Sequence, residues 1–171
     1  MKIVTFCYQL AISCWLGGSA LFTFLLTPIL FRAYSRDMAG GIVGVLLPGY
    51  FRWALVCGGV ALLCRLLLRG RFTVTAALIL TAMLALTTVQ ATVIEPRAAA
   101  LKVEIPSFDT TPADHPLRVQ FRRLHSFSMA ANLAVIGGGV VLILLAVLTP
   151  PGVEGHDRVL ARPRRRTTSL R

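Results

Sequence analysis

The stretch FRRLHSFSMAANLAVIGGGVVLILLAVL, from Phe121 to Leu148, decides the fold of this chain. From Ser126 to its end it contains no charged side chain. An α-helix rises about 1.5 Å per residue, so about 20 apolar residues cross the roughly 30 Å hydrocarbon layer of a bilayer. Because backbone polar groups in lipid must bond within their own segment, the stretch predicts a transmembrane helix.

Three further apolar runs precede this one, and together they set the fold class. The chain has 171 residues, of which 56% are hydrophobic, and its mean hydropathy is +0.72. A soluble domain has an apolar share of about 45–50%. We therefore predict an all-α polytopic membrane protein, a compact bundle of four transmembrane helices with both termini in the cytoplasm. The predicted spans are about residues 3–31, 40–69, 72–95 and 119–148, within one transmembrane domain over residues 1–149.

The charged residues indicate the orientation and the partners. The formal net charge is +11, and six of the 18 Lys and Arg residues lie between Arg158 and Arg171. Such a basic segment usually marks the cytoplasmic face and binds anionic lipid headgroups. We expect residues 150–171 to form a disordered cytoplasmic tail, and the membrane to be a bacterial cytoplasmic membrane. Nucleic-acid binding is the other use of such a tail, but no folded basic module accompanies it.

Prolines indicate where the helices end or bend. The outer loop, about residues 96–117, contains EIPSFDTTPADHP and should be extended and irregular. Pro48 leaves Gly40–Leu47 as either a separate short helix or a kinked extension of the second span. Pro28 should bend the outer end of the first span, because it removes a helix hydrogen bond. The carbonyls that it frees should bond to two nearby hydroxyl side chains, those of Thr23 and Thr27.

Small residues recur where the helices should touch. In lipid, helix association depends on the close approach of backbones, and glycine permits it. Two of the glycines are four residues apart, in the GxxxG spacing typical of helix contacts. The glycines that we expect at packing seams are Gly17, Gly18, Gly40, Gly44, Gly58, Gly59, Gly137 and Gly138.

Three motifs resemble a known family. They are WLGGSALFTFLLTPILF (Trp15 to Phe31), RDMAGGIVGVLLPGYF (Arg36 to Phe51) and FRRLHSFSMAANL (Phe121 to Leu133). They are similar to bacterial four-span proteins that share a domain of unknown function and resemble eukaryotic transmembrane protein 205. The resemblance implies four membrane helices. The eukaryotic relative is associated with resistance to platinum drugs, which points to export or trafficking of soft-metal compounds. It provides no catalytic residue.

A polar stripe on the fourth span is the main candidate site. At about 100° per residue, Arg122, His125, Ser128 and Asn132 share one helix face. Glu95 should stand at the same depth and pair with Arg122 or a protonated His125. Polar groups at this depth are costly unless paired, so they suggest function. The residues expected to line an outer-facing polar pocket are His125, Asn132, Glu95, Arg122, Arg52 and Gln90.

The alternative interpretation of this stripe is structural. Its members can hydrogen-bond between helices and lock the bundle, or they can lie among lipid headgroups. A transport role requires the stripe to face a cavity, whereas a locking role requires it to face other helices.

The four cysteines form a second pattern. In antiparallel spans Cys7 comes level with Cys64, and Cys14 with Cys57. Seven residues rise about 10.5 Å, so the four thiols cannot share one metal ion. Two thiol pairs remain possible as ligands of a soft metal such as Cu(I), but isolated cysteines in apolar helices are usually small hydrophobic residues. We therefore expect neither a metal site nor a cofactor.

Three classes of function follow from these patterns. The first is a module that binds or helps to transport a small molecule or metal compound at the outer pocket. The second is a structural subunit that stabilises a membrane-protein partner or forms a homo-oligomer. The third is a metal- or redox-linked subunit. The chain contains no nucleophile–base motif, phosphate loop or HExxH motif, so we do not expect an enzyme.

Overall fold

The protein is a bundle of four long helical rods. The structure, a computed structural model, describes residues 1–68 and 72–148, and it contains no strand in these ranges. Each rod is 32 residues long and apolar enough to cross a membrane. At about 1.5 Å per residue a rod measures about 48 Å, well beyond the hydrocarbon thickness. The expected all-α, four-helix membrane fold is therefore confirmed, and the chain is an integral membrane protein.

The rods are built from six α-helices and two short π-helical segments. The first rod comprises α1 (Lys2–Ala20), η1 (Leu21–Leu26) and α2 (Thr27–Ala33), and the second is α3 (Arg36–Leu67). The third comprises α4 (Thr73–Val89), η2 (Gln90–Ile94) and α5 (Glu95–Glu104), and the fourth is α6 (Pro116–Val147).

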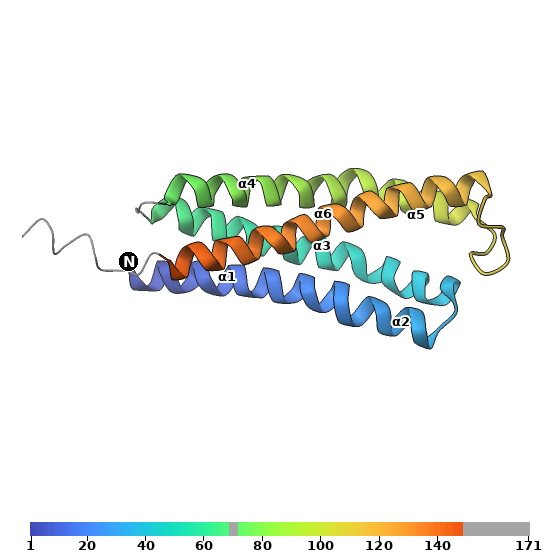
Figure 1. Cartoon of the computed structure of the whole chain (residues 1–171), viewed down its shortest axis with the longest axis horizontal. Helices are drawn as coiled ribbons and strands as arrows, with labels where there is room; N and C mark the ends of the chain where they lie inside the picture. The colour runs from blue at the N-terminus through green and yellow to red at the C-terminus, as the bar shows by residue number, and fades with distance from the viewer. Residues whose placement is uncertain (69–71, 149–171) are drawn as a thin grey trace, which may run out of the picture.

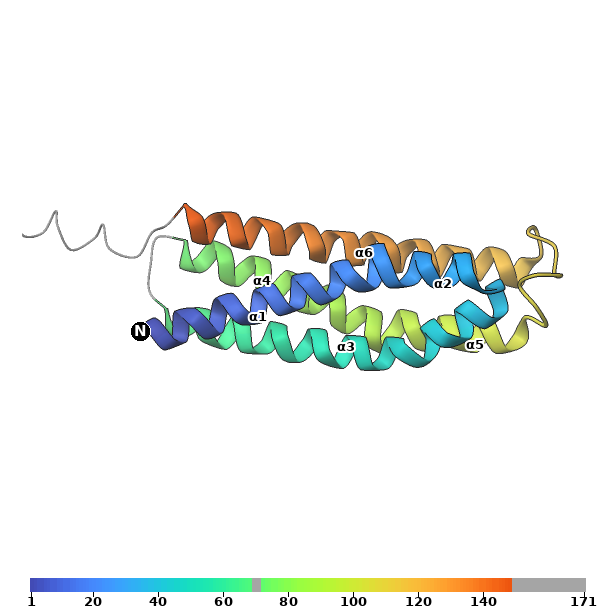
Figure 2. The same ribbon diagram turned by 90° about the horizontal axis from the view of Figure 1, so that it is seen from below.

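Consecutive rods run antiparallel and close into a ring. α1 packs on α3 and α6, and α4 packs on the same two helices. One end of the bundle holds the N-terminus and the end of α6, and we call it the N-terminal end (Figures 1 and 2). The connection between α5 and α6 lies at the opposite end, which we call the loop end.

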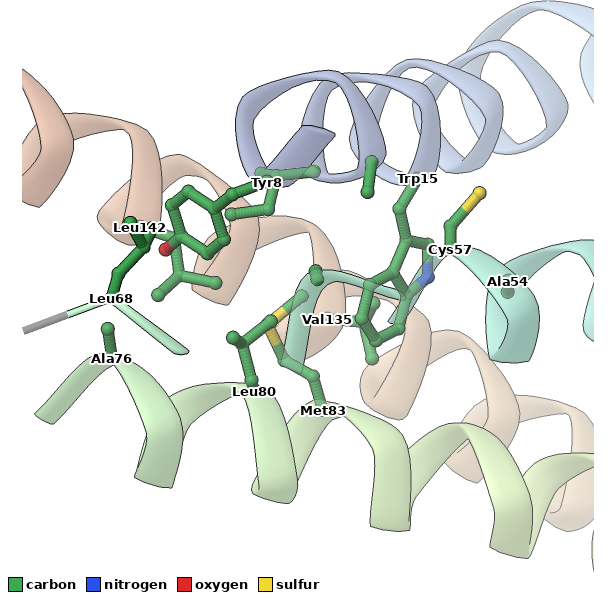
Figure 3. Close-up of a cluster of buried hydrophobic side chains, with 13 residues drawn as sticks. Tyr8, Trp15, Ala54, Cys57, Leu68, Ala76, Leu80, Met83, Val135 and Leu142 are labelled. Atoms are coloured by element: carbon green, nitrogen blue, oxygen red, sulfur yellow. The ribbon is translucent and has the colours of Figure 1, made fainter. Parts of the chain in front are cut away.

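The apolar core fills the N-terminal half of the bundle. Trp15, which is 1% exposed, reaches from α1 toward residues of the other three rods (Figure 3). Leu80 of α4 and Leu142 of α6 are fully buried in the same cluster, and Leu142 lies at its other end, near Tyr8 and Leu68. Lipid tails are as apolar as these side chains, so the rods are held by close packing rather than by the hydrophobic effect.

Glycines admit this packing at some seams and not at others. A Cβ atom on Gly58 would lie 2.5 Å from the Trp15 ring and 2.6 Å from the Leu84 side chain. One on Gly138 would lie 2.8 Å from the Met83 sulfur, and one on Gly18 would lie 3.2 Å from the Trp53 indole nitrogen. Gly40 and Gly44 instead face the end of the Lys102 side chain. At three of the expected seam glycines an added Cβ atom would meet no other atom of the bundle within 4 Å, so these glycines do not lie at a seam between rods: Gly17, Gly59 and Gly137.

Both π-helical segments end two residues before a proline, η1 before Pro28 and η2 before Pro96. A proline ring clashes with the carbonyl four residues upstream and donates no hydrogen bond. In the wider π turn the amides of Thr27 and Glu95 bond to carbonyls five residues back, so the rods continue. The Thr27 hydroxyl donates to the Phe22 carbonyl at 2.8 Å, but this carbonyl also accepts from the Thr27 amide, so it is not one that Pro28 frees.

The structure corrects one expectation about helix ends and decides between two alternatives for another. Residues 97–104, expected within the irregular loop, are helical, because Pro96 occupies the first turn of α5, where its missing N–H is not needed. Gly40–Leu47 is not a separate helix, so of the two alternatives the structure supports an extension of the second span. It belongs to the continuous helix α3, which contains Pro48 in its interior.

The contact between Gly58 and Trp15 makes a sharp test of this packing. We expect Gly58→Ala to lower the free energy of unfolding by about 2 kcal/mol, because the new methyl group overpacks a fully buried ring. Thermal denaturation of the detergent-solubilised protein would measure it. The adjacent change Gly59→Ala is the control, since its methyl group meets open space and alanine favours the helix by up to about 1 kcal/mol. Equal losses in the two variants would contradict the assignment of this seam.

Candidate functional site

A hydrogen-bonded cluster joins three rods in the middle of the bundle. The hydroxyl of Tyr50 on α3 lies 2.6 Å from Asn132 Oδ1 on α6 and 3.0 Å from Ser19 Oγ on α1. Because the amide oxygen can only accept, Tyr50 donates to Asn132, and the Ser19 hydroxyl donates to Tyr50. Asn132 Nδ2 donates to Thr23 Oγ1 on η1 at 2.5 Å. We call these four residues the central polar cluster.

The second π-helical segment makes a similar contact with α6. Ser128, one turn before Asn132, donates to Gln90 Oε1 at 3.0 Å. Gln90 begins η2 and is only 2% exposed. Each π segment therefore presents one polar side chain to the stripe on α6, Thr23 from η1 and Gln90 from η2. Asn132 and Gln90, both expected to line a pocket, are engaged in helix–helix hydrogen bonds.

The other members of the predicted pocket lie nearer the loop end. His125 and Arg122 are exposed on α6, and the His125 ring stacks on Phe121 with 6.2 Å between centroids. The expected pairing of Glu95 with Arg122 or His125 is not present in the structure. Over residues 1–68 and 72–148, the Glu95 carboxylate has no hydrogen bond or ion pair.

Two hollows toward the loop end are lined in part by charged side chains. A niche of about 180 Å³ between α3 and the third rod is lined by Arg52, Glu95, Pro48, Phe51, Leu55 and Ala91. A groove of about 480 Å³ lies between α5 and α6. We call it the α5–α6 groove, and its lining residues are Arg97, Ala100, Leu101, Glu104, Gln120, Arg123 and Leu124. Of the predicted pocket residues, the structure thus brings together Arg52 and Glu95.

The connection between α5 and α6 is fastened to the start of α3 by two carboxylates. Asp37 accepts from the Ser107 hydroxyl and the Phe108 amide, each at 2.6 Å. In return Asp109 accepts from the amides of Arg36 and Asp37, at 3.2 Å and 3.4 Å. A carboxylate beside the free amides of a helix N-terminus is favourable. Sequence reasoning missed this latch, although Asp37 in the first turn after Ser35 is a helix-start signal that could have located one half of it.

The cysteines lie in the core half of the bundle and are all free thiols. Cys57 is buried in the core cluster, and Cys14 and Cys64 pack against that cluster. No group of three or more His, Cys, Asp or Glu side chains that could hold a metal ion occurs in the described part of the chain. The thiol pairs Cys7–Cys64 and Cys14–Cys57 stay a prediction.

The fold and the four apolar rods define a multi-pass membrane protein, and a family match refines this class. The family described as "Domain of unknown function (DUF4149)" matches residues 10–107, more than half of the 171 residues. The chain therefore belongs to the DUF4149 family. The matched range contains three members of the central polar cluster and one arginine of the α5–α6 groove. No curated protein and no solved structure matches the chain.

Stability measurements can distinguish the residues of the α6 stripe that bond to other rods from those that do not. We expect Asn132→Ala to lower the free energy of unfolding by about 1–2 kcal/mol, because it removes hydrogen bonds to two other rods. His125→Ala, seven residues away, removes an exposed ring with no hydrogen bond to the described residues and should leave the melting temperature nearly unchanged. Thermal denaturation in detergent measures both. A loss at His125 as large as that at Asn132 would contradict this division of the stripe.

Proposed function

We propose that the protein is a membrane-embedded binding module that holds the polar headgroup of an anionic phospholipid in the α5–α6 groove. A single observation carries the proposal. The groove combines two guanidinium groups with one carboxylate, and no ion pair joins them. The side chains of the central polar cluster and of the Ser128–Gln90 pair, in contrast, are hydrogen-bonded to one another, which speaks against a path through the interior.

The height of the two arginines supports a phosphate ligand. Arg97 lies 24 residues from Thr73, and Arg123 lies 24 residues from Val147, both counted from the N-terminal end. Each therefore stands at about 36 Å along its rod, just beyond a hydrocarbon layer of about 30 Å. Lipid phosphates lie at this level. A phosphate placed between the two rods would be within reach of both guanidinium groups, which bind phosphate oxygens in bidentate geometry.

The charge and the lining of the groove narrow the ligand class. Two arginines and Glu104 leave a formal charge of +1, which complements the single negative charge of a lipid such as phosphatidylglycerol. Ala100, Leu101 and Leu124 add apolar surface beside the charged groups. This combination suits an amphiphile better than a free phosphate ion.

Lipid retention tests the proposal. Native mass spectrometry of the detergent-solubilised protein, titrated with phosphatidylglycerol, should give an apparent Kd that rises about tenfold in Arg123→Gln. A tenfold change corresponds to about 1.4 kcal/mol, the scale of one charge-assisted hydrogen bond. Arg97→Gln should behave alike.

The adjacent Arg122 supplies a matched control, because it has the same charge but does not line the groove. Arg122→Gln should leave the Kd unchanged. Equal weakening in Arg122→Gln and Arg123→Gln would show that net charge alone attracts the lipid, and it would refute a groove-specific site. Binding of phosphatidylcholine as tight as that of phosphatidylglycerol would refute the assigned ligand class.

A second candidate function is that of a subunit that stabilises a membrane-protein partner or a second copy of the chain. It is favoured by Gly17, Gly59 and Gly137, which are open at the surface of the bundle, where a further helix could approach closely. This role needs no ligand of its own.

The remaining expectations belong to the same proposal. Both termini would lie in the cytoplasm of a bacterium, on the strength of the basic segment 150–171, which falls outside the described residues. The resemblance to transmembrane protein 205 supports soft-metal compounds as an alternative ligand. A non-enzymatic role is supported by the lack of a catalytic motif in the sequence.

A further inference from the structure

The niche between α3 and the third rod holds two opposite charges that do not pair with each other. Arg52 enters it from α3 and is exposed, and Glu95 enters it from the start of α5 and is half-buried. Within the part of the chain that the structure describes, the Arg52 guanidinium and the Glu95 carboxylate have no hydrogen bond or ion pair. We call this hollow the Arg52–Glu95 niche.

The Arg52–Glu95 niche lies at the end of a long apolar run. The third rod has no charged side chain from Thr73 to Ile94, which is 22 residues or about 33 Å of helix, and Glu95 follows directly. This run is long enough to cross a hydrocarbon layer of about 30 Å, so we expect Glu95 to stand at the edge of that layer. An unpaired charge at this depth is costly, and lipid tails offer it no partner.

The two charged residues enter the niche from different depths. The contact between Gly58 and Leu84 shows that these positions of α3 and α4 lie at about the same height. Arg52 is six residues nearer the loop end than Gly58. Glu95 is eleven residues nearer the loop end than Leu84. The Cα atom of Arg52 is therefore about five residues, or about 7.5 Å, deeper in the bundle than that of Glu95.

A phosphoethanolamine headgroup carries its charges in the same order. Its phosphate is joined to glycerol, next to the acyl chains, and its ammonium group lies two carbon atoms farther out. A guanidinium group binds phosphate oxygens, and a carboxylate accepts hydrogen bonds from an ammonium group. Pro48, Leu55 and Ala91 add apolar surface to the niche, which suits the glycerol and the first acyl carbon atoms.

We propose that the Arg52–Glu95 niche binds the phosphoethanolamine headgroup of a membrane phospholipid, with the phosphate on Arg52 and the ammonium group on Glu95. The formal charges of the two residues cancel, as do those of this headgroup. An anionic lipid would bring no cation to Glu95. A choline headgroup has the same phosphate, but its quaternary ammonium group has no N–H to donate. The niche shares no residue with the α5–α6 groove, so this inference does not depend on the anionic-lipid proposal.

The affinities for two zwitterionic lipids test the inference. Native mass spectrometry of the detergent-solubilised full chain, titrated separately with phosphatidylethanolamine and phosphatidylcholine, gives an apparent Kd for each lipid. We expect phosphatidylethanolamine to bind about tenfold more tightly, the effect of one charge-assisted hydrogen bond. Glu95→Met removes the acceptor and should abolish this preference. Arg52→Gln should weaken the binding of both lipids about tenfold and keep the preference, because both lipids contain the phosphate.

Two residues outside the niche supply matched controls. Arg122→Gln and Asp114→Asn each remove one exposed charge of the same sign as a niche residue, and both should leave the two Kd values unchanged. If Glu95→Met fails to fold, Glu95→Gln replaces it, because glutamine keeps the shape of the side chain and removes its charge. The preference should then fall without an increase in the affinity for phosphatidylcholine.

Three results would overturn the inference. Equal affinity of the unsubstituted protein for the two lipids would exclude an ammonium contact at Glu95. Tighter binding of both lipids by Glu95→Met would mean that Glu95 pairs with Arg52 and closes the niche. Glycerophosphoethanolamine, the same headgroup without acyl chains, should not compete with the lipid at equal concentration. Competition by this soluble compound would exclude a lipid as the source of the headgroup.

Discussion

A polypeptide in hydrocarbon must satisfy its backbone hydrogen bonds by itself, and the whole structure follows from how the chain meets this constraint. It makes each apolar run a helix. The prolines within the first and third rods conflict with it, because a proline donates no backbone hydrogen bond. The π-helical segments before Pro28 and Pro96 keep those rods continuous. They also present Thr23 and Gln90 to α6, where these residues bond to Asn132 and Ser128. A local repair of the backbone thus supplies the polar contacts between rods.

The four helices could be predicted from sequence because length and hydropathy alone determine them. The end of the third rod could not, because a proline signals a helix start as well as a break, and Pro96 is followed by helix up to Glu104. The glycine pattern gave only part of the packing. Gly58 and Gly59 are adjacent in the sequence, but one faces Trp15 and the other faces open space. Which face of α3 turns inward depends on the other rods.

The candidate site shows a similar limit. The expected depth in the membrane grouped Asn132 with His125 in one site. Depth alone does not determine which of these side chains has a hydrogen-bond partner on another helix. Tyr50 was missed because a tyrosine in an apolar run is ordinarily an interfacial residue, whereas here its hydroxyl connects α1 and α6. The unpaired charges of the α5–α6 groove instead gather at the loop end of the third and fourth rods. The side chains of the central polar cluster are hydrogen-bonded to one another, whereas the charged side chains of the α5–α6 groove form no ion pair. This difference makes the groove the better candidate for a binding site.

The closed ring of rods has a consequence for biosynthesis. Each rod packs on its neighbours in sequence, and only α6 returns to α1. Chains are made from the N-terminus, so α6 is the last of the four rods to be synthesised and to reach the membrane. Until then the Thr23 hydroxyl and the Gln90 amide have no Asn132 or Ser128 to meet, and the bundle has an open, partly polar seam. The seam therefore closes only when α6 is in place. A truncated product without α6 exposes polar groups to lipid, and a factor that recognises such groups can distinguish it from the finished protein.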